Sequence, residues 1–270
     1  MNLIVAESIE HNVAKLRESL PSALLLCGEP GVGLMTLAKY LAGDDIEAEL
    51  YPVDKDDEPS PYGTVSIESI RKLYDQTRGK TRNRQVIVID DADKMSHNAS
   101  NALLKLLEEP PRNTHFILTS HDPNNLLPTV RSRLQKLVVP RISSQQTTAM
   151  ISDKIDEKVH RQLEFMALGR PAELSRLMTD PEYFDSQSAR FSEARVFLQA
   201  GNYEKIILIN KLSSQRAALE FCDSVLAISR SVVSSRAEVR VVKQIESLLK
   251  ARERIAANGN IKLNMLRAML

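Results

Sequence analysis

The chain of 270 residues contains no tryptophan, only two cysteines and only 4% aromatic residues. Cys27 and Cys222 are far apart and each has apolar neighbours, so the sequence supports neither a disulfide framework nor a thiolate zinc site. We expect two buried free thiols. The shortage of aromatic rings leaves few surfaces for stacking on nucleotide bases, which argues against a dedicated nucleic-acid-binding module.

Neither sign of charge dominates. The 36 basic and 35 acidic residues give a net charge of +1, so no overall positive field attracts DNA. No apolar run approaches the ~20 residues that a membrane span needs, and residues 1–12 lack the basic and apolar regions of a secretory signal. We therefore expect a cytoplasmic protein with no membrane anchor.

Short apolar runs without alternation are typical of strands buried on both faces of a parallel sheet. Residues 86–89, 116–119 and 136–139 form three such runs, and residues 23–27 form an apolar run before a glycine-rich loop. Between the first two runs the spacing predicts a helix that Ser96 caps and Pro110-Pro111 ends. Its expected apolar face consists of Ala99, Ala102, Leu103, Leu106 and Leu107.

Strands that alternate with helices predict a doubly wound α/β domain over residues 1–139. All twelve prolines lie at or before Pro181, and the rest of the chain has helical spacing without strand-like alternation. We expect a small helical subdomain over residues 140–180, with two helices separated at Gly169-Arg170-Pro171. Residues 181–270 are predicted to form an all-helical domain.

The loop from Gly28 to Gly33 has the glycine spacing of a phosphate-binding P-loop, including Gly31, and lies between a predicted strand and a predicted helix. Such a loop turns backbone N–H groups toward phosphate oxygens. However, Leu34 and Met35 stand where a P-loop carries the lysine and the magnesium-binding hydroxyl. The pattern therefore predicts the remnant of a nucleotide site.

The segment VIVIDDAD, residues 86–93, has the form of a Walker B strand. Asp90 occupies the position of the magnesium-binding carboxylate, and Asp91 that of the glutamate that activates water. Asp91 is one methylene shorter than that glutamate. A glycine loop and this strand together, in an α/β context, favour a former nucleotide-binding fold over coincidence.

The residues that follow carry a family resemblance. The segments NALLKLLEEPP and LLPTVRSRL resemble the AAA+ clamp-loader subunits of DNA polymerase III, and among these the delta-prime type. The resemblance is strong over about residues 20–140 and weak over 140–180. It implies an AAA+ sheet domain, a small helical lid and a helical C-terminal collar.

In that family an arginine of a Ser-Arg-Cys motif reaches the ATP of a neighbouring subunit. The resemblance places this arginine finger at Arg133, after Ser132, although Leu134 replaces the cysteine. Without the resemblance, a surface pair with an acid such as Asp122 is the simpler reading of Arg133. Arg131 is a competing candidate, because two positions along an extended segment lie on the same side.

The family's second sensor arginine aligns with Ala172, and Arg170 lies two residues early. Thr119 and Ser120 stand at the first-sensor end of a strand, where they are expected to satisfy backbone groups. The zinc module of many delta-prime proteins is not expected, because residues 44–63 contain no cysteine or histidine.

Together these losses imply a subunit that does not hydrolyse ATP, with no bound cofactor or metal. The expected partners are gamma/tau-type ATPase subunits and a delta subunit, with primer-template DNA and the sliding clamp reached through the complex. The alternative is an active gamma/tau-like ATPase that uses Thr36 or Lys39 for the missing groups. Lys39 lies more than one helical turn past Leu34, so it is expected to point elsewhere.

Overall fold

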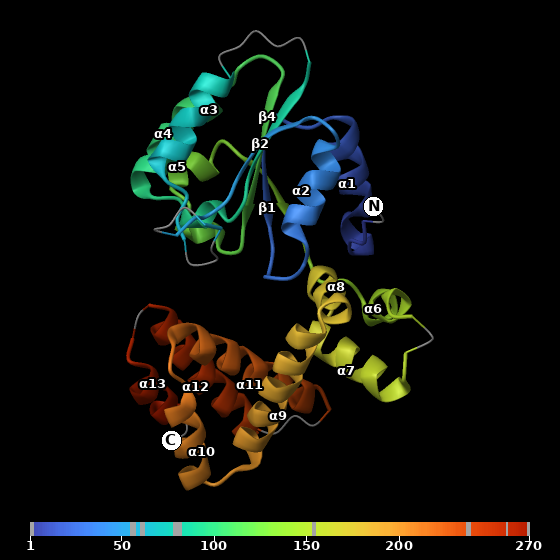
Figure 1. Ribbon diagram of the computed structural model, residues 1–270, viewed down its shortest axis with the longest axis vertical. Coiled ribbons are helices and arrows are strands. Elements are labelled where there is room, and N and C mark those ends of the chain that lie inside the picture. The colour runs from blue at the N-terminus through green and yellow to red at the C-terminus, as the bar shows by residue number, and fades with distance from the viewer. Residues whose placement is uncertain are drawn as a thin grey trace. The chain divides into compact units, whose positions relative to one another are not determined.

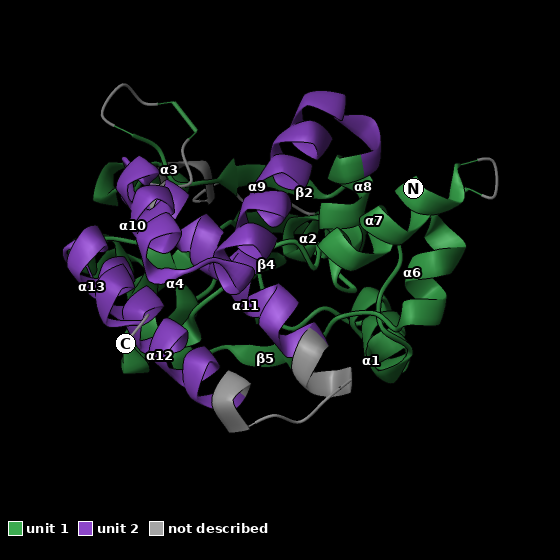
Figure 2. Ribbon diagram, turned by 90° about the horizontal axis from the view of Figure 1, so that it is seen from below, with its two compact units in different colours: residues 1–177 green, residues 178–270 purple. Residues whose placement is uncertain are grey.

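The fold is that of a computed structural model, which describes residues 3–54, 58–59, 63–77, 83–152, 155–235, 239–257 and 259–268. Two compact units, residues 1–177 and residues 178–270, make up the chain (Figures 1 and 2). Each unit is considered by itself below.

A parallel sheet forms the centre of the first unit. Its strands are β1 (Ala23–Cys27), β2 (Ile46–Leu50), β3 (Gln85–Ile89), β4 (Thr114–Ser120) and β5 (Gln135–Val138). They lie in the order β2-β3-β4-β1-β5, and each neighbouring pair is parallel. The three predicted strands are confirmed. The edge strand β2 was not predicted, because Glu47 and Glu49 interrupt its apolar residues.

Helices cover both faces of this sheet (Figure 1). The side chains of Leu24 and Leu26 pack in a core with α1 (Glu7–Glu18) and α2 (Leu34–Ala42). The alternate residues, including Leu25, pack with α3 (Ile67–Thr77), α4 (His97–Glu108) and α5 (Pro128–Arg131). Strands buried on both faces are the reason that the sequence shows no alternation, and the predicted doubly wound α/β class is confirmed.

The predicted helix before Pro110 is confirmed as α4. The Ser96 hydroxyl accepts a hydrogen bond from the Ala99 N–H at 3.1 Å, and the helix ends at Glu108. Ala99, Leu103, Leu106 and Leu107 are buried, as the predicted apolar face requires. Two short 3₁₀ turns, η1 (Ala92–Lys94) and η2 (Pro123–Asn125), follow strands β3 and β4.

The segment after the sheet contains three helices where the sequence predicted two. These are α6 (Ser144–Met150), α7 (Glu157–Ala167) and α8 (Pro171–Thr179). The predicted break at 169–171 separates α7 from α8, whereas the break between α6 and α7 carries no proline or glycine. The Gln146 amide donates to the Val5 carbonyl at 2.9 Å, which ties α6 to the start of the chain.

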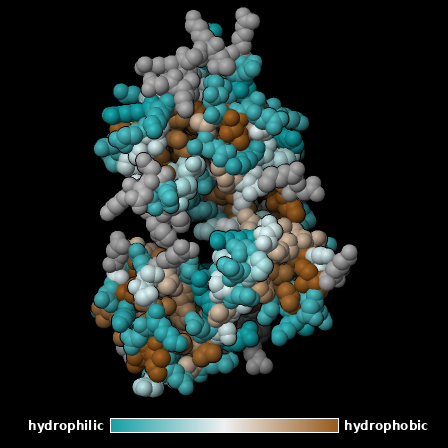
Figure 3. All heavy atoms as spheres, in the orientation of Figure 1, coloured by the Kyte–Doolittle hydropathy of each residue, from teal (hydrophilic) through white to brown (hydrophobic). Residues whose placement is uncertain are grey.

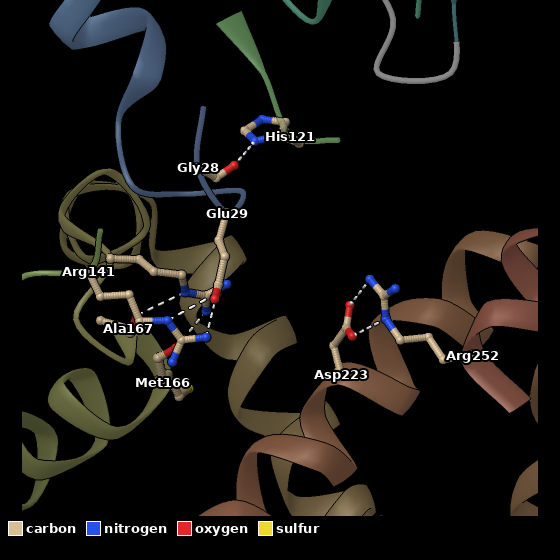
Figure 4. Close-up of polar contacts among 9 residues, drawn as sticks. Gly28, Glu29, His121, Arg141, Met166, Ala167, Asp223 and Arg252 are labelled. Carbon is tan, nitrogen blue, oxygen red and sulfur yellow. Dashed lines mark hydrogen bonds and ion pairs between the residues drawn. The ribbon is translucent and has the colours of Figure 1, made fainter. Parts of the chain in front are cut away.

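The second unit is helical, as predicted for the end of the chain. It consists of α9 (Pro181–Gln199), α10 (Asn202–Lys211), α11 (Gln215–Ser235), α12 (Val239–Ala256) and α13 (Ile261–Arg267). Phe197 meets Phe221 edge to face, with ring centroids 5.4 Å apart. Asp223 and Arg252 form a bidentate ion pair between α11 and α12 (Figure 4).

The two cysteines are free and buried, as predicted. No helix in the described residues has the length and apolarity to cross a bilayer. Apolar side chains nevertheless interrupt the hydrophilic surface of the second unit (Figure 3). The exposed ones include Val196 on α9 and Tyr203, Ile206 and Ile207 on α10.

Candidate functional site

The carboxyl ends of β1, β3 and β4 carry the predicted nucleotide-site residues. Gly28 follows β1, Asp90 follows β3, and Ser120 ends β4. In open parallel sheets this edge is where ligands bind, and the chain direction brings the three segments together there. The Gly28 N–H donates to the Ser120 carbonyl at 3.3 Å, so the loop begins against the end of β4.

Aliphatic side chains pack against the start of the glycine loop. A side-chain carbon at Gly28 would lie 2.7 Å from the Val139 carbonyl oxygen, 2.8 Å from a Val32 methyl and 3.3 Å from a Leu34 methyl. Only glycine fits there. Val32 and Leu34 are each 3% exposed and belong to the core on the α1–α2 face, against which Met35 also packs. The residue that stands in for the P-loop lysine is therefore a core residue.

The loop also contacts the start of α8. The Gly31 carbonyl accepts hydrogen bonds from the N–H groups of Ala172 and Glu173, at 3.0 and 3.1 Å. These are first-turn N–H groups, which a helix leaves without internal partners. Gly31 has φ +89°, and a side chain there would meet the Glu173 Cβ at 3.0 Å. The helix end that could face an anion thus donates to the loop itself.

Arg141 strengthens this junction (Figure 4), and Arg170 closes the end of the preceding helix. Arg141 forms an ion pair with Glu29 of the loop, with its Nε 3.0 Å from the carboxylate. Arg170 donates to the carbonyls of Ala167 and Met166, at 2.9 and 3.0 Å, and so closes the end of α7. Ala172, which aligns with the second-sensor arginine, contacts the loop through its backbone N–H, which donates to the Gly31 carbonyl.

Asp90 is held by Thr119. The Thr119 hydroxyl donates to Asp90 Oδ1 at 2.5 Å and accepts from the Asp91 N–H at 2.9 Å. Burial raises the pKa of the Asp90 carboxyl; the Thr119 hydrogen bond opposes this and the nearby Asp91 carboxylate adds to it. Thr119 thus satisfies a backbone group, as expected, whereas no partner is found for the buried Ser120 hydroxyl among the described residues.

Asp91 has the left-handed conformation, with φ 46°, and its carboxylate is already paired. It forms an ion pair with Lys94, and His121 Nε2 lies 3.4 Å from its Oδ1. His121 Nδ1 donates to the Gly28 carbonyl at 2.8 Å, so this ring joins the loop to the Walker B segment (Figure 4). Sequence reasoning missed His121, because one histidine after a strand has no periodic signal.

Of the two residues offered as substitutes for the missing lysine and hydroxyl, Thr36 lies beside the loop, since a Cβ at Gly33 would be 3.9 Å from its Oγ1, whereas Lys39 does not. Lys39 Nζ lies 2.9 Å from Glu49 on β2, so it points elsewhere, as predicted. Part of the segment 44–63 forms β2, while residues 55–57 and 60–62 of that segment lie outside the described residues. Within the described residues no cluster of three or more His, Cys, Asp or Glu side chains is placed to hold a metal ion.

Arg133 and Ser132 contact another set of residues, in the turn after α5. Arg133 donates to Glu108 Oε1 at 2.6 Å and to the Thr129 carbonyl at 2.8 Å, and its side chain is 37% exposed. The Ser132 hydroxyl donates to the same Thr129 carbonyl at 3.0 Å. The simpler reading of Arg133, a surface pair with an acid, matches this contact, but the acid is Glu108 and not Asp122, whose carboxylate accepts from the Asn124 N–H.

The argument that made Arg131 a competitor was also wrong. The segment is a helical turn and not an extended strand, since the Arg133 N–H donates to the Val130 carbonyl. Residues two apart in a helix do not share a face. Arg131 donates to Asn124 Oδ1 at 3.0 Å, away from Glu108.

Comparisons with known proteins give matches in sequence and in fold. The family model described as DNA polymerase III, delta subunit, matches residues 46–143. Subunit delta' of Pseudomonas aeruginosa is 29% identical over 171 residues, which cover 62% of this chain and 50% of that protein. The chain is thus similar to DNA polymerase III delta' subunits. Subunit tau of Bacillus subtilis is 30% identical over 166 residues, covering 53% of this chain and 29% of that protein.

The aligned region thus spans half or less of the length of these two curated relatives. A solved structure extends the likeness in fold. A gamma subunit-related protein of DNA polymerase III from Thermotoga maritima matches with a TM-score of 0.59 and 20% identity, covering 97% of both chains. At that identity the match establishes the fold alone. The chain shares that protein's fold, an α/β domain followed by a helical C-terminal part.

Proposed function

We propose that this chain is a delta'-like subunit of a bacterial DNA polymerase III clamp loader, in which it does not hydrolyse ATP. Its role is that of a stator that supplies Arg133 in trans to the ATP site of a neighbouring gamma/tau-type subunit. One contrast carries the proposal. The apolar side chains of Val32 and Leu34 are buried against the chain's own glycine loop, whereas the Arg133 side chain is 37% exposed.

The loop supports the absence of hydrolysis. An ATPase needs a cation for the β- and γ-phosphates and a hydroxyl for magnesium. Leu34 is buried beside Val32, and Lys39 is paired with Glu49. Asp90 Oδ1 already accepts a hydrogen bond from the Thr119 hydroxyl at 2.5 Å.

The turn that carries Arg133 supports the role in trans. An arginine finger stabilises charge that develops on the transferred phosphoryl group, and its guanidinium must reach beyond its own subunit. Arg133 is partly exposed and donates to Glu108 and the Thr129 carbonyl, whereas Arg131 is directed to Pro123 and Asn124. The partners we propose are gamma/tau-type and delta subunits, with the clamp and primer-template DNA engaged through the complex.

The test is Arg133→Ala in a loader reconstituted from the full-length chain and its gamma/tau-type and delta partners. We expect assembly to be unchanged, while DNA-stimulated ATP turnover at saturating ATP falls by about tenfold or more at the site that Arg133 serves. Size-exclusion chromatography and a phosphate-release assay measure the two quantities.

Arg131→Ala is the matched control and should keep at least half of the parental turnover. Unchanged turnover in Arg133→Ala would remove the finger assignment. Micromolar, magnesium-dependent binding of ATP to the isolated chain would contradict the non-hydrolysing role.

A further inference from the structure

Glu108 is the acid that meets the guanidinium of Arg133. It is the last residue of α4, and Arg133 lies in the turn after α5. Arg133 reaches it with one terminal nitrogen at 2.6 Å, while the other terminal nitrogen donates to the Thr129 carbonyl at 2.8 Å. A guanidinium held at both terminal nitrogens has little rotational freedom left.

The scaffold fixes both ends of this contact. Leu107, next to Glu108, and Val130, three residues before Arg133, are buried in the same core on the α3–α4 face of the sheet. α4 ends at Glu108, and Pro110 and Pro111 follow one residue later, so the helix does not continue past the acid. The packing of α4 against α5 therefore fixes where the backbones of Glu108 and Arg133 lie relative to each other.

The contact leaves most of the guanidinium available. Arginine has five N–H donors, and the described residues account for two of those on Arg133. The side chains of Arg133 and Glu108 are 37% and 49% exposed, so water weakens their attraction. A triphosphate with several negative charges can share the guanidinium without breaking an expensive buried pair.

We propose that Glu108 is a positioning residue for the arginine that this chain supplies to its neighbour; this inference rests on the proposed function. Glu108 and the Thr129 carbonyl hold the guanidinium before the subunits meet, so less side-chain freedom is lost when the transition state forms. Donors that are preorganised toward developing charge act on the chemical step more than on substrate binding.

The experiment is a double-mutant cycle in the reconstituted loader. Glu108→Ala should lower the DNA-stimulated kcat at the affected site about three- to tenfold, with the KM for ATP changed less than twofold. Glu108→Gln should recover at least half of the parental kcat, because its amide oxygen still accepts from the guanidinium. Arg133→Ala combined with Glu108→Ala should equal Arg133→Ala alone within about twofold, since Glu108 acts only through that arginine.

Glu109→Ala is the matched control, because Glu109 is the next residue, is exposed and has no ion pair within the described ranges. It should behave like the parent. Because the Glu108 pair is exposed, the unfolding midpoint of Glu108→Ala should stay within about 3 °C of the parental value.

Three results would overturn the inference. If Glu108→Ala leaves kcat unchanged or raises it, the acid does not position the arginine. If the double variant falls well below Arg133→Ala, Glu108 supports something other than the arginine. If Arg133→Ala itself has no effect, the proposed function fails, and the inference about Glu108 fails with it.

Discussion

Two aliphatic side chains, Val32 and Leu34, determine what the glycine loop can hold. Both have methyl groups within van der Waals reach of the Gly28 position, and both are almost completely buried. Backbone N–H groups alone could still face an anion, but a buried hydrocarbon gives no compensation for phosphate charge. At the residue scale, the loop is thus part of the core on the α1–α2 face.

Cys222 allows a test at the same scale in the second unit. It is fully buried, its Sγ lies 3.3 Å from the Met265 Sδ, and burial raises its pKa to about 12 from 9.0. The unfolded chain loses this proton at a lower pH than the folded chain. The stability that Cys222 contributes is therefore complete below about pH 9 and is lost as the pH rises toward 12.

Between pH 8 and 10.5 the parent should lose roughly 2 kcal/mol more free energy of unfolding than Cys222→Ala, as measured by urea titration at each pH. Cys27→Ala is the matched control, because it keeps Cys222 and so should keep most of the parental slope. Equal slopes for the parent and Cys222→Ala would show that the thiol ionises freely in the folded protein.

At the scale of elements, the junction of the glycine loop with α8 makes residues 140–177 a continuation of the sheet domain. Two contacts join them: the Gly31 carbonyl with the first N–H groups of α8, and the Glu29–Arg141 ion pair. The first contact is backbone to backbone at a positive φ, while the second joins two partly exposed side chains. The backbone contact should therefore carry more of the stability.

Gly31→Ala should lower the free energy of unfolding by about 1 to 3 kcal/mol, because alanine is strained at φ +89° and its Cβ crowds Glu173. Glu29→Ala should cost less than ~1 kcal/mol. Urea unfolding of the full-length chain measures both. The reverse ranking would mean that the ion pair, and not the capped helix end, holds α8 to the loop.

Much of the architecture follows from local pattern, since buried parallel strands and a capped amphipathic helix leave clear signals. The carboxyl ends of such strands meet, so Gly28 and Asp90 could be assigned to one edge of the sheet from the sequence. The edge strand β2 could not, because its two acids resemble a loop. The contact of Glu108 with Arg133 depends on how α4 packs against α5, and no short-range pattern carries that information.

Over the whole molecule, apolar residues remain exposed on the second unit. Tyr203 is 77% exposed, and Ile206 and Ile207 are 41% and 44% exposed, all on α10. A helix with this many uncovered aliphatic groups is typical of a surface that a partner covers. In the proposed loader, that partner is another subunit.

Ile206→Lys combined with Ile207→Lys should weaken assembly with the gamma/tau-type and delta subunits at least tenfold, because two charges replace apolar contact area. Helical content should be unchanged, since both positions are exposed. Analytical ultracentrifugation and circular dichroism measure these quantities, with Gln199→Lys on α9 as an exposed control. Normal assembly of the double variant would exclude this face of α10 as an interface.

The burial of Leu34 also constrains how this sequence can change over time. A lysine at that position would place an ammonium among the methyl groups that now surround Leu34, and the protein would lose stability before it gained any nucleotide chemistry. Each single mutation toward an active loop would therefore lower stability without an immediate gain in function. In the proposed loader, a lineage with this packing would depend on its neighbour for hydrolysis, and the two subunits would have to diverge together.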